Sequence, residues 1–239
     1  MNDETVTADF FDDELLATLA RRILSMAEGE RLPSERGLAE ELGVSRTALR
    51  DRLGRLESMG VLERRTGSGS FVRGLRPESI SESLMLGLVA SQLTVASLRS
   101  VRFALERQAA YEAAQRVSHV EVARMAVAVD RMDASDDTQE LYDADIEFHR
   151  ALFAASESPA LIFFSNVLQG VLSRTLQHLE LSDDRIQMRK LHRAIYSSVS
   201  LRDPASSMRA IDEHFLWLEE LVAKNQHSPA AVTDTAASR

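Results

Sequence analysis

The chain has 239 residues, 44% of them hydrophobic, and a formal net charge of −9. It contains no cysteine, which excludes disulfides, thiolate nucleophiles and cysteine-ligated zinc or iron–sulfur sites. No apolar run approaches the roughly 18 residues that span a bilayer, and the acidic start of the chain lacks the order of a signal peptide. The composition, rich in leucine and alanine and poor in glycine and proline, therefore favours a cytoplasmic, mainly helical protein without a membrane partner.

The charge is unevenly distributed along the chain. Residues 1–30 carry a net charge of −6 and residues 77–239 a net charge of −7, whereas residues 31–76 hold 10 arginines against 6 acidic residues. Arginine makes forked contacts to phosphates and to guanine edges. The basic segment is compatible with a nucleic-acid contact, but its charge alone does not identify one.

Three helices are predicted after an acidic N-terminal arm at residues 1–13. Leucine and isoleucine recur at helical spacing over residues 14–27. Pro33 ends this segment, and Ser34 is a favourable N-cap for a second helix. Gly43 begins a tight turn, after which Ser45 caps a third helix. In that helix a leucine stripe is buried, while the opposite face carries Arg46, Thr47 and Arg50.

A two-stranded hairpin is predicted next, because the hydrophobic period changes to two after Gly60. The stretches VLERR and SFVR flank a glycine-rich tip that contains Gly67 and Gly69. Three helices followed by a hairpin form a winged helix-turn-helix, which we expect over residues 14–74, with the third helix in a DNA major groove. The alternative is a small helical domain with an incidental basic face. The joint occurrence of turn, caps, arginine pair and wing favours DNA binding.

A second, all-helical domain is predicted over residues 82–225, after a linker at residues 75–81. Helical patterns cover residues 79–91, 95–117, 119–133, 138–156, 159–180, 184–201 and 204–225. Residues 226–239 are expected to form a disordered tail. The predicted fold class is therefore mainly α, with an N-terminal winged helix-turn-helix and a C-terminal bundle of about seven helices.

One aspartate and three histidines on three of these helices are candidate ligands of a divalent transition metal. Asp145 and His149 are four residues apart, so both side chains leave one helical face. His192 and His214 lie among apolar neighbours in two later helices. Helical bundles can hold metals in their cores between facing helices. The alternative is a simple ion pair with hydrogen-bonded core histidines, but the two further histidines favour a metal.

Arg102 and Glu106 are also four residues apart, on a long helix with a buried stripe. Periodicity alone favours an ordinary salt bridge between them, worth only about 0.3–0.5 kcal/mol. The functional alternative is that Arg102 receives the carboxylate of a ligand.

The sequence resembles a family of bacterial regulators. The stretch RLPSERGLAEELGVSRTALRDRLGRLESMGVLERRTGSGSFV resembles the winged helix-turn-helix of GntR-type transcription regulators. The elements VRFALE, DADIEFH, HRAIY and HFLWL are similar to the FCD ligand-binding domain of the FadR subfamily. The resemblance covers about residues 14–225.

The resemblance implies specific roles for residues in both domains. It implies a metal on Asp145, His149, His192 and His214, with zinc as the first choice and nickel, manganese or iron as alternatives. The effector would be a small carboxylate or sugar acid that contacts Arg102 and Asn166. A homodimer would bind a pseudo-palindromic operator in double-stranded DNA and act as a repressor. The DNA contacts would come from Arg36, Ser45, Arg46, Thr47, Arg50, Gly67 and Gly69.

The sequence departs from the family pattern at two places, and two other functions stay open. Arg52 stands where the family has a small residue, and the acidic arm Met1–Asp13 falls outside the pattern. The same four ligands would also suit a direct metal-ion sensor or a metal-dependent hydrolase that uses an activated water. The winged domain and the lack of an evident general base argue against the hydrolase.

Overall fold

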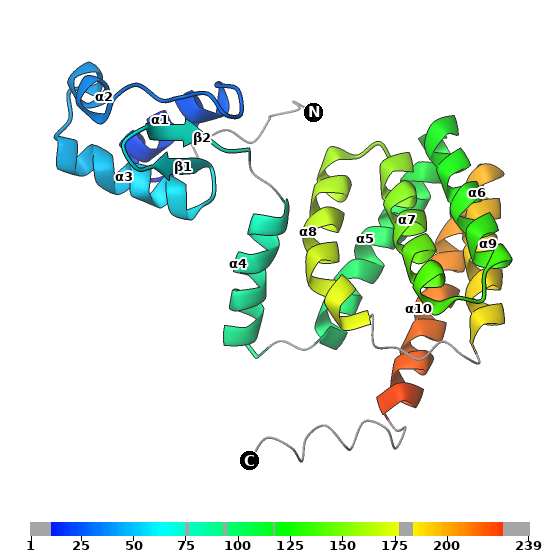
Figure 1. Ribbon diagram of the computed structural model, residues 1–239. Helices are drawn as coiled ribbons and strands as arrows, with labels where there is room; N and C mark the ends of the chain where they lie inside the picture. Colours follow the sequence, from blue (N-terminus) through cyan, green and yellow to red (C-terminus); the bar gives the residue numbers. More distant parts are fainter. Residues whose placement is uncertain (1–10, 75–76, 93–94, 117, 177–183, 227–239) are drawn as a thin grey trace, which may run out of the picture. The chain divides into compact units, whose positions relative to one another are not determined.

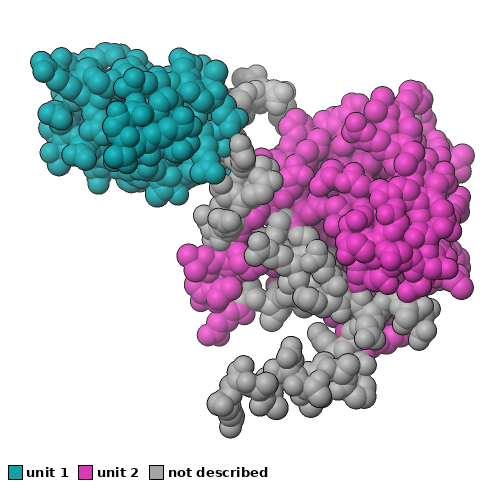
Figure 2. Space-filling view, in the orientation of Figure 1, with its two compact units in different colours: residues 1–80 teal, residues 81–239 magenta. Residues whose placement is uncertain are grey.

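The structure is a computed structural model, and it describes residues 11–74, 77–92, 95–116, 118–176 and 184–226 (Figure 1). The chain divides into two compact units, Met1–Ile80 and Ser81–Arg239 (Figure 2). The described residues form ten helices and one two-stranded antiparallel sheet. This confirms the predicted mainly helical fold. None of the helices in the described ranges has both the length and the apolar character that crossing a membrane requires.

The first unit is a three-helix domain with a β-hairpin. Its elements are α1 (Glu14–Leu24), α2 (Glu35–Leu42), α3 (Arg46–Ser58), β1 (Leu62–Arg65) and β2 (Gly69–Val72). Each helix turns its apolar stripe inward, so that Leu19, Leu38 and Leu53 meet in one core. Ser34 and Ser45 accept the N–H groups of Gly37 and Ala48, each at 3.1 Å. Both predicted N-caps are therefore confirmed.

The turn between α2 and α3 depends on Gly43. This residue ends α2 with φ of +66°, a left-handed conformation that favours glycine. Two residues later, the hydroxyl of Ser45 caps the N-terminus of α3. These local signals fix the direction of α3 and expose one of its faces.

The hairpin is held at both edges of β2. Leu62 pairs with Val72, and Arg65 pairs with Gly69. On the other edge, the N–H of Leu32 donates to the carbonyl of Ser70 at 2.9 Å. The N–H of Val72 donates to the backbone carbonyl of Glu30 at 2.8 Å. The segment before α2 therefore anchors the hairpin to the helices.

Asp13, which we assigned to an arm without a role, is part of this domain. Its Oδ1 accepts the N–H of Leu16 at 3.0 Å and so caps α1. Its Oδ2 accepts the Nε–H of Arg52 at 3.0 Å and lies 3.3 Å from Nη1 of Arg55. Asp13 thus joins the start of α1 to α3 and neutralises Arg52, the residue that departs from the family pattern. Residues 1–10 of the predicted arm lie outside the described residues.

We expect the Asp13→Asn variant to unfold at a lower temperature than the wild type at pH 7. The N–H of Leu16, followed by Arg52 and Arg55, holds the pKa of Asp13 below its usual value of 3.8. The carboxylate therefore stabilises the fold above this value, and the contribution disappears as the pH falls through the lowered pKa. Thermal melts between pH 7 and pH 3 should show the unfolding temperatures of the wild type and of Asp13→Asn converging as the pH falls. The exposed neighbour Asp12 provides the control Asp12→Asn. If the unfolding temperatures of the wild type and Asp13→Asn differed by the same amount at every pH, the ion-pair explanation would be contradicted.

The predicted bundle of seven helices makes up the second unit, except that the first four residues of its first helix, residues 77–80, fall within the first unit. The seven helices are α4 (Pro77–Ala90), α5 (Val95–Arg116), α6 (His119–Ala134), α7 (Thr138–Ala155), α8 (Pro159–Leu176), α9 (Arg185–Ser200) and α10 (Pro204–Gln226). Helices α5, α6, α7, α9 and α10 surround one core that contains Phe148, Met132 and Ile211. Helix α8 lies beside α5 (Figure 1), and a smaller core forms where Leu88 of α4, Leu98 of α5 and Leu168 of α8 meet.

Two predicted boundaries need correction. We assigned residues 75–81 to a linker, but α4 begins at Pro77, because proline is favourable at the first position of a helix. Ser81 is buried, and its hydroxyl donates to the carbonyl of Val167 at 2.7 Å. The predicted start of the second domain at residue 82 thus falls inside α4. Residues 177–183 and 227–239, which include the predicted tail after Gln226, lie outside the described residues.

Candidate metal centre and nucleic-acid interface

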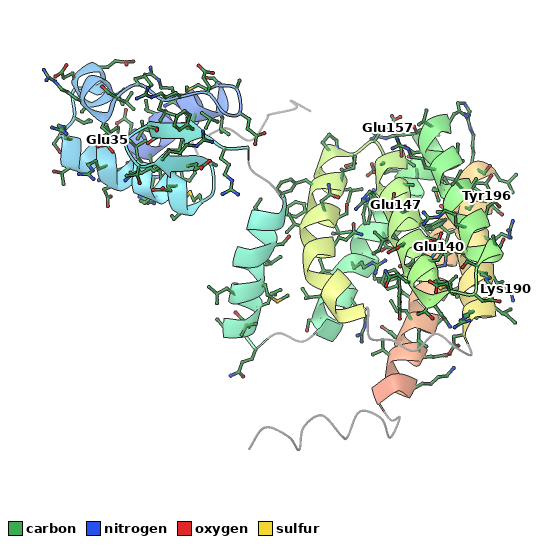
Figure 3. All side chains as sticks on the ribbon, in the orientation of Figure 1. Glu35, Glu140, Glu147, Glu157, Lys190 and Tyr196 are labelled. Carbon is green, nitrogen blue, oxygen red and sulfur yellow. The ribbon has the colours of Figure 1, made fainter. Side chains whose placement is uncertain are left out.

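The exposed face of α3 carries the residues that we predicted to contact DNA. Arg46, Thr47 and Arg50 are exposed, whereas Leu49, Leu53 and Leu56 are buried on the opposite face. Nε of Arg50 lies 3.4 Å from Oε2 of Glu35, which is labelled in Figure 3. Arg46 forms no ion pair with any residue in the described ranges. Its guanidinium group is therefore available to a ligand without breaking such a pair.

The other predicted DNA contacts surround this face. Arg36 is exposed on α2 and forms an ion pair with Glu40 at 3.0 Å. The hydroxyl of Ser45 accepts the N–H of Ala48, so its proton remains free to be donated. Gly67 and Gly69 are exposed at the hairpin tip, with φ of +74° and +108°. A Cβ atom at Gly69 would lie 3.1 Å from Nε of Arg31, whereas a Cβ atom at Gly67 would meet open space.

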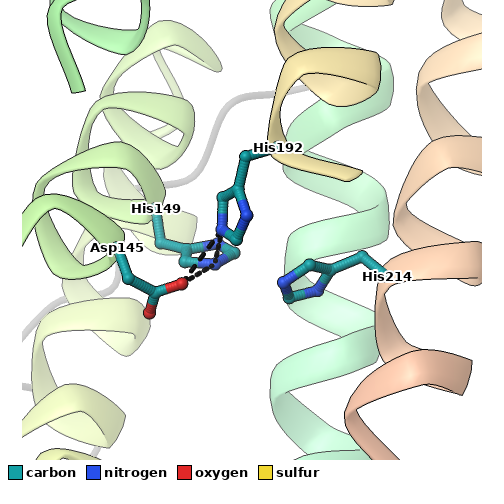
Figure 4. Close-up of side chains that lie close together, drawn as sticks. All are labelled: Asp145, His149, His192 and His214. Carbon is teal, nitrogen blue, oxygen red and sulfur yellow. Dashed lines mark hydrogen bonds and ion pairs between the residues drawn. The ribbon is translucent and has the colours of Figure 1, made fainter. Parts of the chain in front are cut away.

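The four predicted metal ligands converge inside the second unit. Asp145 and His149 come from α7, His192 from α9 and His214 from α10 (Figure 4). One potential ligand atom from each residue lies within 4.8 Å of the others. All three histidines are buried, and Asp145 is partly buried. The helical spacing of Asp145 and His149 brings both side chains to one face, and the bundle supplies the other two ligands.

A contact outside the cluster orients the imidazole of His192. Nδ1 of His192 lies 2.8 Å from the carbonyl of Met188, which can only accept, so this nitrogen carries the proton. The other nitrogen, Nε2, lies 2.9 Å from Oδ1 of Asp145, and in the neutral ring it carries the lone pair that a metal would use. Nε2 of His149 is 3.5 Å from the same oxygen and 3.4 Å from Nε2 of His192. Both Nε2 atoms thus face one point beside Asp145.

Glu106 is a further member of the site that the sequence analysis did not identify. Its side chain is fully buried on α5, and Oε2 lies 2.9 Å from Nδ1 of His149. Its Oε1 forms the ion pair with Nε of Arg102 that the spacing predicted. A signal was present in the sequence, because Glu106 shares its helical stripe with Ala109, Ala110 and Ala113. A carboxylate in a buried stripe requires partners.

The charges of the site shift the pKa values of its members. Burial alone would raise the pKa of both carboxyl groups, but Arg102 and His149 lower that of Glu106 to about 2. His149 and His192 hold the pKa of Asp145 well below its usual value. Against the effect of burial, Glu106 and Asp145 raise the pKa of His149 to about 9. Burial and the two neighbouring imidazoles lower the pKa of His214 well below its usual value, so this ring is neutral.

The donor set fits a divalent transition metal. Its members are three imidazole nitrogens and one carboxylate oxygen, which suit zinc, nickel, manganese or iron. Nδ1 of His214 is buried and has no hydrogen-bond partner among the described residues. The ring of His214 nevertheless lies 4.8 Å from that of His192 and 5.2 Å from that of His149. A neutral imidazole without a partner in a polar cluster is costly unless a ligand satisfies it.

The two predicted effector contacts differ in their relation to this cluster. The Arg102 side chain is 14% exposed, and its guanidinium carbon lies 5.9 Å from the centre of the Phe215 ring. Its Nε is engaged by Glu106, so the remaining N–H groups are those available to a carboxylate. Asn166 lies half-buried on α8, whereas the candidate ligands come from α7, α9 and α10.

A surface groove of about 360 Å³ lies between α6 and α7, on a different side of α7 from the cluster residues. Its three arginines already have partners: Arg124 pairs with Glu121, Arg131 with Glu140 and Arg150 with Glu147. Glu140 and Glu147 are labelled in Figure 3. The groove therefore offers no free cation to an anionic ligand among its described residues.

Comparisons with known proteins match both units. The family model of the FCD domain matches residues 97–216, and the model of bacterial regulatory proteins of the gntR family matches residues 12–72. The HTH-type transcriptional regulator LutR of Bacillus subtilis is 29% identical over 202 residues, covering 82% of this chain and 92% of its own. The putative L-lactate dehydrogenase operon regulatory protein of Escherichia coli is 30% identical over 204 residues, which cover 81% of this chain and 78% of the relative.

A third relative and a solved structure extend the comparison. An HTH-type transcriptional regulator of Mycobacterium tuberculosis is 31% identical over 217 residues, which cover 85% of this chain and 86% of the relative. The structure of Streptococcus agalactiae GntR superposes with a TM-score of 0.67 at 22% identity, over 87% of this chain and 98% of that one. At this identity the structural likeness concerns the fold.

Proposed function

We propose a specific function on the premise that this chain belongs to the GntR family of bacterial regulatory proteins and carries an FCD domain. It is a ligand-responsive transcriptional regulator and not an enzyme, with a DNA-binding winged helix-turn-helix and a second domain for a small molecule. What remains to be proposed is the ligand, the metal and the manner of DNA recognition.

The ligand that we propose is a small carboxylate held at a metal. The observation that carries this proposal is the convergence of Asp145 and three buried histidines, with the N–H groups of Arg102 close to the same cluster. A bound divalent metal would supply a Lewis-acidic anchor for one carboxylate oxygen. Arg102 would bind the acid through the nitrogens that Glu106 does not engage, and Asn166 would add a polar contact. A relative of this chain is named for an L-lactate dehydrogenase operon, so L-lactate is the first acid to test.

The mode of DNA binding follows from the exposed face of α3. Arg46 and Arg50 would contact guanines in the major groove, and Ser45 and Thr47 would contact phosphates or base edges. Arg36 would act from the start of α2, while Gly67 and Gly69 would bring the hairpin backbone towards the minor groove. Two chains would form a cytoplasmic homodimer on a pseudo-palindromic operator, as a repressor that the acid releases.

We expect L-lactate, citrate or gluconate to raise the unfolding temperature of the metal-loaded protein, and the effect to disappear after chelation. A ligand that binds only the folded state stabilises it by about 2.7 kcal/mol at 100 times its Kd. Thermal melts with each acid, with zinc and with a chelator, measure this directly. An equal shift in chelated protein would place the acid away from the metal. No shift with any acid, together with DNA affinity that follows free metal, would favour a direct metal sensor.

A further inference from the structure

Glu106 occupies a position that connects two functional groups. One of its oxygens lies 2.9 Å from Nδ1 of His149, an ion-pair distance without hydrogen-bond geometry, so that a small rotation of the ring would align the two groups. The other oxygen pairs with Nε of Arg102. The side chain of Glu106 is fully buried, and that of His149 is only 6% exposed, so water does not substitute for this contact. Glu106 touches His149 on the nitrogen that points away from Asp145, and therefore from the side opposite the proposed metal.

This arrangement is the one that orients an imidazole towards a metal. A carboxylate at one ring nitrogen fixes the proton there, leaves the lone pair on the other nitrogen and makes the ring a stronger ligand. His192 has an equivalent partner in the carbonyl of Met188. For His149 the partner is charged, and its position is in turn fixed by Arg102, whose guanidinium carbon lies near the Phe215 ring.

We propose that Glu106 is the positioning residue of the metal centre, which holds His149 through Nδ1, and that Arg102 anchors Glu106 in this role. The inference rests on the proposed metal site. It assigns to Arg102 a second task besides contact with the effector, because the same guanidinium group keeps the carboxylate in place. The competing explanation is that Glu106 serves only to neutralise a buried arginine.

The two explanations differ for a pair of variants. Glu106→Gln keeps the size of the side chain but removes its charge, and leaves Arg102 without its counter-ion. The double variant Arg102→Gln/Glu106→Gln removes both charges and leaves no unpaired arginine. If Glu106 positions His149, both variants should bind zinc about 10- to 100-fold more weakly than the wild type. If Glu106 only neutralises Arg102, the double variant should bind zinc as tightly as the wild type.

The measurement is zinc affinity by competition with a chelating dye, together with the visible spectrum of the cobalt-loaded protein. We expect the spectra of both variants to differ from that of the wild type, because the band positions report the ligand field at the ion. Asp212→Asn is the matched control: it removes a carboxylate that also pairs with an arginine of α5, Arg107, at 2.8 Å. This variant should keep the affinity and the spectrum of the wild type.

Wild-type affinity and spectrum in Glu106→Gln would overturn the inference, as would recovery of both in the double variant. If Glu106→Gln does not fold, the zinc affinity of the double variant alone decides between the two explanations. Failure of the wild-type protein itself to bind zinc or cobalt would instead refute the metal centre of the proposed function, and the inference with it. The measurement on the wild type therefore distinguishes failure of the proposed metal centre from failure of the positioning role of Glu106.

Discussion

The His192→Ala/His214→Ala double variant should lose its bound metal completely. These residues supply the ligands of α9 and α10, and without them only the two α7 ligands, Asp145 and His149, remain. Two ligands from one helix leave most of the coordination shell to water, so metal retention through a desalting column should fall to background. Elemental analysis of the purified protein measures the metal content.

The same variant should also lose the stabilisation that metal confers. A metal present at 1,000 times its Kd stabilises the folded state by about 4.1 kcal/mol. Truncating two buried rings also creates cavities, so the informative quantity is the difference between melts with metal and with chelator. His119 is an exposed histidine on α6, and His119→Ala should retain the full metal-dependent difference. Unchanged metal content in the double variant would refute the site.

The second large effect is expected at the DNA interface. Arg46→Ala should weaken binding to a specific duplex by about 1–3 kcal/mol, which is about 5- to 150-fold in Kd. Arg46 should show a larger effect than Arg50, because a DNA contact of Arg50 competes with its ion pair to Glu35. The side chain of Arg46 is exposed, so its removal should leave the fold intact.

This experiment requires a duplex that the wild type has selected from a random pool, and an unrelated duplex as reference. Loss of a base contact should reduce the affinity for the selected duplex more than that for the reference, since phosphate contacts are common to both. Arg21 is exposed on α1, and Arg21→Ala controls for the loss of one positive charge. Equal binding of the selected duplex by Arg46→Ala and wild type would show that α3 docks differently.

Features encoded locally in the sequence could be predicted. The caps at Ser34 and Ser45 and the tight turn at Gly43 each depend on a few neighbouring residues, and the structure has all three. The pair Asp145 and His149 follows from helical spacing. His192 and His214 could be identified because histidines within apolar stripes are unusual, and the structure brings both to this pair. One local signal is misleading: Ser118 and Glu121 have the spacing of a capping box, but the Ser118 side chain makes no capping hydrogen bond at the start of α6.

Contacts between distant segments could not be predicted from one sequence. Besides the adjacent Asp51, Arg52 pairs with Asp13, 39 residues earlier, so from the sequence the arginine appeared to be an unexplained extra charge. Glu106 and His149 are 43 residues apart, and the spacing on α5 indicated only the ion pair to Arg102. Such contacts depend on how helices pack, which hydrophobic periodicity does not specify.

The chain has a single tryptophan, and its location has a practical consequence. Trp217 is 8% exposed on α10, its ring centre lies 5.7 Å from that of His214, and its N–H is 3.3 Å from Oδ1 of Asp184. All tryptophan emission therefore originates one helical turn from a candidate ligand. Ions with a partly filled d shell, such as nickel or cobalt, quench nearby indoles, whereas zinc has a filled shell. The natural fluorescence of the protein thus provides an optical report on which ion occupies the bundle, without any added label.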